Sequence, residues 1–544
     1  MLGPIILQQA IDTYILPGNF QGLSVLLGGY VLLVIAGFAA HYWQLIQLET
    51  AGLQIIGTLK KAAFRHLVNL DLPFFDQHTT GKLVSRIEND ANAMKILFSS
   101  VMSNVVSNLL VMIGMFGIMA WQYDLKLAVY VVGICPLILA AGVLFQRLMR
   151  PLLIRIREKV AEVNGLLTEV IQGIGTIQMF EQQDRFMQRI KESSVAKNRL
   201  ESWMTIGFNS FFNVLFFVQN LALALVLWFG GNLVMDGGLS VGSLVLFMVF
   251  IRTFFGPIMF LSSQFNEFQK AVAGGHRIFD LLQQRAQVQN PTAPVTAPTG
   301  LWDIEFKNVY FRYPGAEGWT LENVSFHCKA GEHWALVGST GSGKTTIISL
   351  LLRFYDPQRG QILVNGIDIQ TLLLKDLRAG VGLVLQDVIF FPGTLWQNLV
   401  LDNQQLERTQ VKSTLSTIGL DQLIERLPTG YDTRLEEGAH NLSEGEQQLL
   451  SFGRALLRDP QLLILDEATS HVDPETEGKI QSAMHSVLRG RTALIIAHRL
   501  STIEATDQIL VLDQGKVIET GSHRELIARE GHYARLHELQ AQHV

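Results

Sequence analysis

The distribution of apolar and polar residues divides the chain into two different halves. Five apolar stretches in the first half are long enough to cross a membrane, since about 20 helical residues span the roughly 30 Å of hydrocarbon in a bilayer. They lie at 23–43, 101–121, 125–145, 208–229 and 241–261, and a shorter apolar stretch, 2–16, precedes them. One such stretch could be a buried helix of a soluble core, but five in one half of the chain predict an all-α transmembrane domain.

Basic residues are concentrated in the long segments that connect the apolar stretches on one side. Segments 44–100 and 146–207 are rich in lysine and arginine, whereas loops 17–22 and 230–240 contain neither. Loops with an excess of positive charge stay on the cytosolic side of a membrane. We therefore expect both long segments in the cytosol. Their helical periodicity continues beyond the apolar stretches, which predicts helices that extend from the membrane as stalks.

Polar side chains also occur within the apolar stretches, where hydrocarbon offers them no hydrogen-bond partners. Ser103, Asn104, Ser107 and Asn108 recur on one helical face, Asn209, Asn213, Gln219 and Asn220 mark another, and Arg252 lies well inside the last stretch. These side chains either line a translocation cavity or form hydrogen bonds between helices. For Arg252, whose charge is costlier to bury, a cavity or a charged partner is favoured.

A proline-rich segment separates the two halves. Residues 285–300 contain Pro291, Pro294 and Pro298 among threonines and alanines, and this composition is typical of linkers. We therefore expect a transmembrane domain with cytosolic loops at 1–284, a linker at 285–300 and an α/β domain at 301–544.

A glycine-rich turn in the second domain predicts a nucleoside triphosphate site. It follows an apolar run at 334–337 and precedes another at 347–352, in the order strand, turn, helix. The turn consists of Gly338, Ser339, Thr340, Gly341, Ser342, Gly343, Lys344, Thr345 and Thr346. Glycines let successive backbone N–H groups point at one anion, and the helix N-terminus adds its positive dipole. Lys344 can reach the β- and γ-phosphates and the Thr345 hydroxyl can coordinate Mg²⁺, so a glycine-rich turn with an incidental lysine is the weaker interpretation.

Polar residues that follow other predicted strands are expected to complete an ATPase site. Asp466 ends an apolar strand and can hold Mg²⁺ through water, and Glu467 can orient and deprotonate the attacking water. His498 can contact the γ-phosphate, and Gln386 can reach both Mg²⁺ and the attacking water. Tyr313 is placed to stack on adenine. Each of these residues alone would more often be structural, but their order along the chain favours a catalytic set.

These motifs resemble the ATP-binding cassette of an ABC transporter. The resemblance rests on 338–346, Asn441-Leu442-Ser443-Glu444-Gly445-Glu446-Gln447, Leu465-Asp466-Glu467, Ser470-His471-Val472-Asp473 and His498. In the first half, Phe74-Phe75-Asp76, Gly81, Ser85-Arg86 and Asp90 are similar to the first cytosolic coupling loop of ABC exporters, and 169–180 to the second. The order of membrane domain and cassette on one polypeptide is that of an exporter.

The resemblance implies a mechanism. Two cassettes would enclose two ATP molecules head to tail, so that Ser443 and Gly445 of one chain act on the ATP of the other. MgATP binding and hydrolysis would switch the membrane cavity between inward and outward access. The family also implies an apolar or amphipathic cargo (drug, lipid or peptide), a bacterial inner or plasma membrane location with the cassette in the cytoplasm, and an elbow helix and the rest of an incomplete first span upstream, making six spans.

The sequence departs from the family pattern in its signature motif. Glu444 and Glu446 stand where Gly and Gln are usual, and a carboxylate about 8 Å from a phosphate would cost roughly 2 kcal/mol at an effective dielectric near 20. Ser470-His471-Val472-Asp473 replaces the usual Ser-Ala-Leu-Asp. With Glu467 and His498 retained, this combination resembles one member of a heterodimeric exporter. A homodimer that tolerates the changes is the alternative.

Composition narrows the function classes further. The formal net charge of −5 gives no reason to expect a nucleic-acid partner, and the two cysteines, Cys135 and Cys328, are too far apart to suggest a disulfide framework. The apolar stretches argue against a soluble ABC ATPase of DNA repair or translation. An ATP-gated channel or a transport regulator of the same superfamily remains an alternative to an exporter.

Overall fold

The protein folds into two compact units, and each unit is formed by two separate segments of the chain. A computed structural model describes residues 2–18, 20, 22–122, 125–386, 388–401, 406–466, 474–497 and 499–541. The first unit comprises 1–68 and 80–284, and the second comprises 69–79 and 285–544. The segment 69–79, which lies far from the cassette in the sequence, therefore belongs to the same unit as the cassette.

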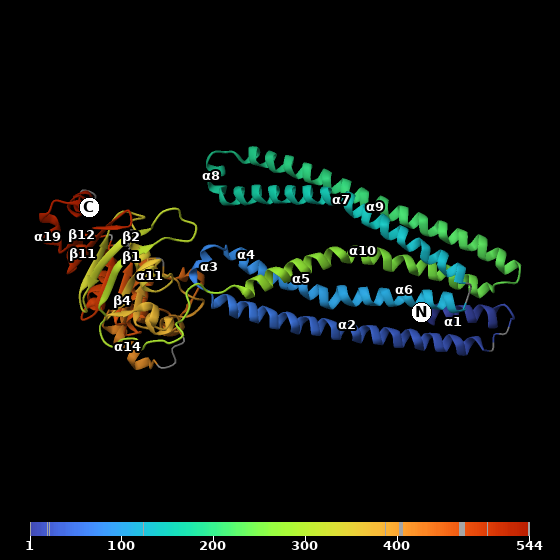
Figure 1. Cartoon of the computed structure of the whole chain (residues 1–544), viewed down its shortest axis with the longest axis horizontal. Coiled ribbons are helices and arrows are strands. Elements are labelled where there is room, and N and C mark those ends of the chain that lie inside the picture. Colours follow the sequence, from blue (N-terminus) through green and yellow to red (C-terminus); the bar gives the residue numbers. More distant parts are fainter. Residues whose placement is uncertain are drawn as a thin grey trace. The chain divides into compact units, whose positions relative to one another are not determined.

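Every regular element in the described part of the first unit is a helix, and its long helices run beside one another (Figure 1). In chain order it contains α1 (Leu2–Gln9), η1 (Ala10–Ile15), α2 (Leu23–Val68), α4 (Thr80–Ser85), η2 (Arg86–Asp90), α5 (Ala91–Ile96), η3 (Leu97–Val101), α6 (Met102–Gln122), α7 (Leu125–Gln172), α8 (Ile174–Met179), α9 (Gln183–Met235) and α10 (Val241–Gln283). The predicted stalks are present, because α2, α7, α9 and α10 each have 43 or more residues, roughly twice what a bilayer requires.

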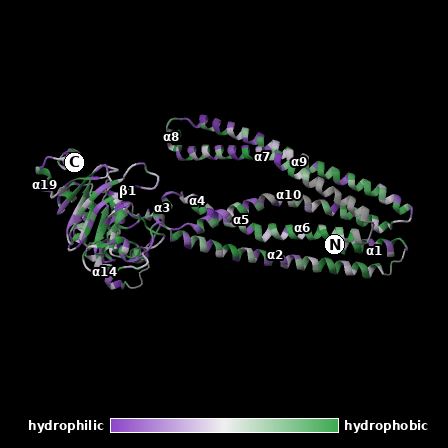
Figure 2. Cartoon of the chain, in the orientation of Figure 1, coloured by the Kyte–Doolittle hydropathy of each residue, from purple (hydrophilic) through white to green (hydrophobic). Residues whose placement is uncertain are grey.

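Three helical segments among the described residues are long and apolar enough to cross a membrane. They are Leu23–Val68, Thr80–Met119 and Gln183–Met235, and Val241–Phe254 is a shorter apolar helix. The predicted stretch 125–145 forms the start of α7, whose side chains between 120 and 139 lie outside the description. Figure 2 shows hydrophobic residues along much of α2, α6 and α9, and mostly hydrophilic residues near α8. This distribution is that of helices that leave the membrane as stalks.

The polar residues of the membrane helices provide examples of bonds between helices. Gln44 of α2 donates to the Ser103 hydroxyl of α6 at 3.2 Å, and Gln219 of α9 donates to the backbone carbonyl of Arg252 in α10 at 3.2 Å. Asn108 instead donates to a carbonyl of its own helix, at 2.8 Å. Interhelical hydrogen bonds therefore account for part of the Ser/Asn/Gln pattern in the apolar stretches.

Two polar contacts fix the position of α10 within this unit. Asp12 of η1 accepts a hydrogen bond from the Gly242 backbone N–H at 2.8 Å and from the Ser240 hydroxyl at 2.6 Å, so it holds the start of α10. Farther along, Arg277 makes a bidentate pair with Asp90 of η2, at 2.8 and 2.5 Å. Such fork-to-fork geometry fixes orientation as well as distance.

The second unit is built on three sheets. A six-stranded sheet has the order β12-β11-β3-β10-β9-β6, a four-stranded antiparallel sheet has the order β2-β1-β4-β5, and β7 and β8 form a small pair. The strands are β1 (Ile304–Phe311), β2 (Leu321–Cys328), β3 (His333–Val337), β4 (Arg359–Val364), β5 (Ile367–Asp368), β6 (Val381–Val384), β7 (Gly393–Thr394), β8 (Arg434–Leu435), β9 (Leu462–Asp466), β10 (Thr492–Ile496), β11 (Gln508–Asp513) and β12 (Lys516–Gly521). The predicted fold class, a helical membrane domain followed by an α/β P-loop domain, is confirmed.

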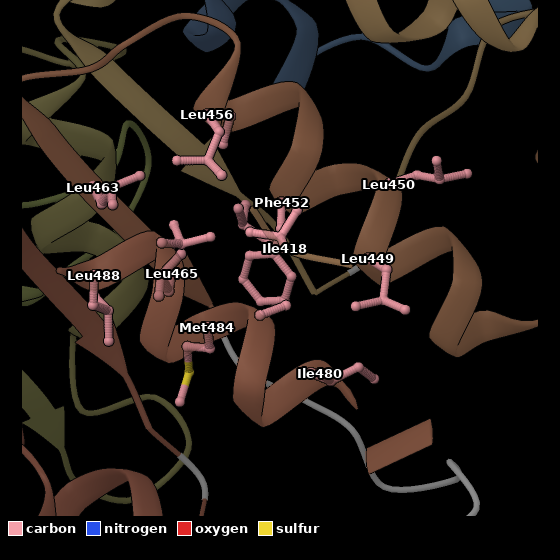
Figure 3. Close-up of a cluster of buried hydrophobic side chains, with 14 of the residues drawn as sticks. Ile418, Leu449, Leu450, Phe452, Leu456, Leu463, Leu465, Ile480, Met484 and Leu488 are labelled. Atoms are coloured by element: carbon pink, nitrogen blue, oxygen red, sulfur yellow. The ribbon is translucent and has the colours of Figure 1, made fainter. Parts of the chain in front are cut away.

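Helices surround the six-stranded sheet and bury its apolar strands. They are α11 (Lys344–Leu351), α12 (Leu374–Ala379), α13 (Leu395–Val400), α14 (Arg408–Ser416), α15 (Leu420–Arg426), α16 (Glu444–Leu456), α17 (Pro474–Leu488), α18 (Leu500–Glu504), α19 (His523–Ala528) and α20 (His532–Ala541). Figure 3 shows the cluster in which Phe452 of α16 and Met484 of α17 lie beside Leu465 of β9. This core anchors α16, which carries the signature motif, to the strand that ends in Asp466.

A short helix from the first half of the chain completes the second unit. This helix, α3 (Leu72–Asp76), buries Phe74. The Asp76 carboxylate accepts a hydrogen bond from the Tyr355 hydroxyl, and Asp71 accepts one from the Val288 backbone N–H at 3.0 Å. The segment that resembles the first coupling loop is therefore bonded to residues of the cassette unit.

Candidate nucleotide-binding site

The register of the parallel strands brings the predicted site residues to one edge of the six-stranded sheet. Ile496 of β10 pairs with Leu336 of β3 on one side and with Asp466 of β9 on the other, and β9 continues the alignment to β6. The carboxyl ends of these strands are where ligands bind in open α/β sheets. The segments that contain the glycine-rich turn, Asp466 and Gln386 thus all start from the same edge.

The glycine-rich turn has the backbone conformation that its sequence predicts. Gly343 has φ +106° at the N-cap of α11, and a Cβ there would lie 2.5 Å from Leu321 Cδ2. At Gly338 a Cβ would lie 2.2 Å from the backbone oxygen of Leu512. Both positions therefore favour glycine, because the positive φ of Gly343 strains any other residue and a Cβ at Gly338 would collide with the backbone of β11.

Two polar groups in the turn suit a phosphate. The Lys344 ammonium donates to the carbonyls of Gly338 at 2.7 Å and Ser339 at 3.0 Å, which leaves its third N–H for an anion. Burial lowers the pKa of Lys344, and the Asp466 carboxylate opposes that shift. Among the described residues, Ser342 Oγ is one of two buried side-chain polar atoms without a hydrogen-bond partner. A phosphate oxygen would satisfy such a hydroxyl.

Tyr313 is fixed at the edge of this turn by two contacts. Its hydroxyl lies 3.2 Å from Thr346 Oγ1, and its ring meets that of Tyr355 edge to face with centroids 5.1 Å apart. Tyr355 in turn bonds Asp76 of α3. Tyr355 was not among the predicted site residues, because the aromatic pair Phe354-Tyr355 just after α11 does not indicate the distant partner of Tyr355. Tyr355 links the predicted adenine-contacting residue to the coupling segment.

The remaining predicted site residues differ in their exposure to solvent, and some of them lie outside the described residues. Thr345 is exposed in the first turn of α11, Asp466 is partly buried at the end of β9, and Gln386 is exposed two residues after β6. Thr340 and Gly341 are exposed in the turn. Glu467, His498 and Ser470-His471-Val472-Asp473 lie outside the described residues, although the strands that lead to Glu467 and His498 are in place.

The signature motif forms the start of α16. The helix begins at Glu444, because Ser443 is its N-cap. The Ser443 hydroxyl accepts from the Glu446 N–H at 3.3 Å, and the Glu446 carboxylate accepts from the Ser443 N–H at 2.9 Å. This reciprocal pair is a capping box, which accepts Glu or Gln. The charge of Glu446 is therefore held by its own helix, whose dipole favours it, while Glu444 is exposed and takes no part in the box.

A cavity of about 470 Å³ opens beside the start of α16. Ser443 and Glu446 line it together with Thr476 and Lys479 of α17. The Ser443 hydroxyl accepts a hydrogen bond in the capping box, so it retains its own proton to donate elsewhere. Buried Gly445 follows in the first turn of the helix.

The fold and this site define an integral membrane protein that carries an ATP-binding, P-loop ATPase domain in the cytoplasm. Residues 1–258 match the family model of the ABC transporter transmembrane region, and residues 321–470 match that of the ABC transporter. The chain belongs to the ABC transporter family, as a half-transporter of the exporter type whose ATP hydrolysis is coupled to transport.

Relatives of known name and structure cover nearly the whole chain. A probable multidrug resistance ABC transporter ATP-binding/permease protein of Bacillus subtilis, YheH, is 37% identical over 96% of this chain and 77% of its own. An ATP-dependent lipid A-core flippase of Aromatoleum aromaticum is 35% identical over 93% of this chain and 83% of its own. The structure of a bacterial Atm1-family ABC exporter with ATP bound superposes with a TM-score of 0.83 at 28% identity, over 99% of this chain and 96% of that one.

Proposed function

We propose that this chain exports an apolar or amphipathic compound by hydrolysing MgATP at the sheet edge described above. In this scheme 1–284 is the transmembrane domain, 285–300 the linker and 301–544 the cassette. The observation that carries the proposal is the glycine-rich turn, in which Lys344 and the unpartnered Ser342 hydroxyl lie together at the start of α11. That arrangement suits the β- and γ-phosphates of a nucleotide.

Each predicted residue receives a role in this scheme. Thr345, Gln386 and, through water, Asp466 would hold Mg²⁺, which neutralises charge on the phosphates. Glu467 orients and deprotonates the attacking water, His498 contacts the γ-phosphate and Tyr313 stacks on adenine. The contacts of Tyr313 with Thr346 and Tyr355 support its role, because they hold the ring beside the phosphate turn.

A second half-transporter would complete the site. Ser443 and Gly445 act on the ATP of the partner, and the free proton of the Ser443 hydroxyl suits a phosphate oxygen. The departures at Glu444 and in 470–473 support a heterodimer, in which Glu467 serves a site completed by the partner's signature. If the chain purified alone hydrolyses ATP as fast as a co-expressed pair, the heterodimer is rejected.

The cargo is inferred at the level of a chemical class. The alignments with the relatives named for multidrug resistance and for lipid A-core flipping each cover more than 90% of this chain. Both names indicate cargo that partitions into lipid, so we propose a drug-like compound, a lipid or an apolar peptide.

Replacing Glu467 by Gln tests the catalytic assignment. In paired complexes reconstituted into vesicles, the variant should bind ATP normally but lose ATP hydrolysis and uphill efflux together, because the water loses its base. Hydrolysis near the parental rate in Glu467→Gln would show that another residue is the base. Hydrolysis without uphill efflux in the parental protein would favour a channel or regulator.

A further inference from the structure

Three short helices at the end of the cassette bring two histidines and a glutamate together. Glu504 ends α18, His523 begins α19 and His537 lies in α20. One potential ligand atom from each of the three lies within 4.8 Å of the others. No residue of this cluster belongs to the proposed nucleotide site.

The backbone around the cluster is fixed by hydrogen bonds at the helix starts. Ser522 and Glu525 form a capping box at the start of α19. At the start of α20, the Glu519 carboxylate accepts from the N–H groups of His532 at 2.7 Å and Tyr533 at 2.9 Å. These hydrogen bonds fix the start of each helix independently of any contact that the histidine side chains make.

The side chains are close to the geometry of a metal site. His537 Nε2 lies 2.9 Å from Glu504 Oε1, and the rings of His523 and His537 have centroids 5.4 Å apart. Nitrogen and oxygen ligands at about 2.0–2.2 Å from a tetrahedral Zn²⁺ are roughly 3.4 Å from one another. Small side-chain rotations would lengthen the 2.9 Å spacing between His537 and Glu504 and shorten the wider spacings, which are at most 4.8 Å, to that value. Glu504 is exposed and both histidines are partly exposed, so ions can enter from solvent.

A buried tyrosine, Tyr533, forms a hydrogen bond with one histidine of the cluster. His523 Nδ1 lies 2.8 Å from the Tyr533 hydroxyl, and Tyr533 is 1% exposed. When Nδ1–H donates to that oxygen, His523 Nε2 is left with a free lone pair. Metal-binding histidines almost always have such a partner on the second ring nitrogen, because it fixes the tautomer and the orientation of the ring.

We propose that Glu504, His523 and His537 bind a divalent transition-metal ion of the Zn²⁺ class, with water as the fourth ligand. Two imidazoles and one carboxylate suit Zn²⁺, Co²⁺ or Ni²⁺, whereas Mg²⁺ prefers oxygen ligands alone. The ion would tie α18 to α19 and α20. Since α18 begins two residues after His498, metal binding would stiffen the backbone beside the proposed γ-phosphate contact.

The test is Co²⁺ binding by the full chain, purified without a histidine tag, stripped of metal and reconstituted in lipid nanodiscs without nucleotide. We expect one equivalent of Co²⁺ to bind with the visible absorption of a four-coordinate ion, and Zn²⁺ but not excess Mg²⁺ to abolish that absorption. His523→Ala and His537→Ala should each weaken binding at least about tenfold, and Tyr533→Phe should weaken it by a similar factor.

His532→Ala is the matched control, because it removes a histidine from the same helix but from outside the cluster. It should leave Co²⁺ binding unchanged, and nucleotide binding by all variants shows that the cassette is folded. Absence of stoichiometric Co²⁺ binding overturns the proposal and leaves Glu504 and His537 as an ordinary hydrogen-bonded pair. Binding that persists at full strength in both cluster-histidine variants overturns it as well, because the ion then lies elsewhere.

Discussion

Replacing Glu446 by Ala tests whether the signature helix begins with the capping box seen in the structure. The carboxylate accepts from the Ser443 N–H at 2.9 Å, and the Ser443 hydroxyl accepts from the Glu446 N–H at 3.3 Å. The substitution removes only the hydrogen bond from the Ser443 N–H to the carboxylate, which costs about 1 kcal/mol, and loss of an acidic residue from the first turn costs about 0.5 kcal/mol more. The alanine variant should therefore open this turn about tenfold more often.

Two matched variants separate the hydrogen bond from the charge. Glu446→Gln retains an acceptor for the Ser443 N–H and loses only the charge, so opening should increase about twofold. Glu444→Ala removes a carboxylate from the same turn without touching the box, so it should also have about a twofold effect. The order of the three variants is a stronger test than any single value.

Hydrogen exchange measured by mass spectrometry is the appropriate assay, because local opening can be read from one peptide. The peptide should include Ser443, Glu446 and Gln447, whose N–H groups all donate within this turn. Equal exchange in Glu446→Ala and the parental protein, or equal effects of Ala and Gln, would refute the capping box. If the box is confirmed, Glu444 is the one of the two signature carboxylates that takes no part in it.

Three other predictions concern the rest of the chain. Arg277→Ala should lower the thermal unfolding temperature by an amount equivalent to about 1.5–3 kcal/mol, because it leaves the largely buried Asp90 carboxylate unpaired. Arg277→Lys cannot form both hydrogen bonds, so it should restore only part of the lost stability. An unchanged unfolding temperature in Arg277→Ala would argue against the pair. The Cys328 thiol is fully buried and burial raises its pKa. In a Cys135→Ser variant, which leaves Cys328 as the single thiol, a maleimide should label the protein only after denaturation, and rapid labelling of the native variant would contradict that burial. Burial raises the pKa of Tyr533 from about 10 to about 12. The stability that this shift contributes should be complete below pH 10 and be lost as the pH rises toward 12. Tyr533→Phe should remove this loss of stability at alkaline pH, and an identical pH profile for the two proteins would refute the assignment.

Local patterns were sufficient to predict most of the fold and the phosphate turn. The apolar run before Gly338 and the glycines up to Gly343 determine a strand, a turn and a helix within a few residues of one another, so their structure depends little on the rest of the chain. From the sequence, Glu446 was interpreted only as a departure from the signature motif, although Ser-Glu-Gly-Glu also satisfies a capping box.

Long-range contacts were beyond the reach of local patterns. Tyr355 bonds Asp76 across 279 positions of sequence, and neither residue belongs to a periodic pattern that indicates the other. The cluster of Glu504, His523 and His537 was missed for the same reason, because its ligands come from three separate helices and have no metal-binding spacing along one helix.

The position of α3 has a consequence for biosynthesis. A ribosome releases α3, with its apolar Phe74, long before it makes Tyr355 and the surface on which α3 docks. Folding of the second unit can therefore finish only after translation of the C-terminal half, when the early segment is recruited. Mutations in α3 would then reduce the amount of mature protein through cellular quality control, even where they leave the chemistry at Lys344 intact.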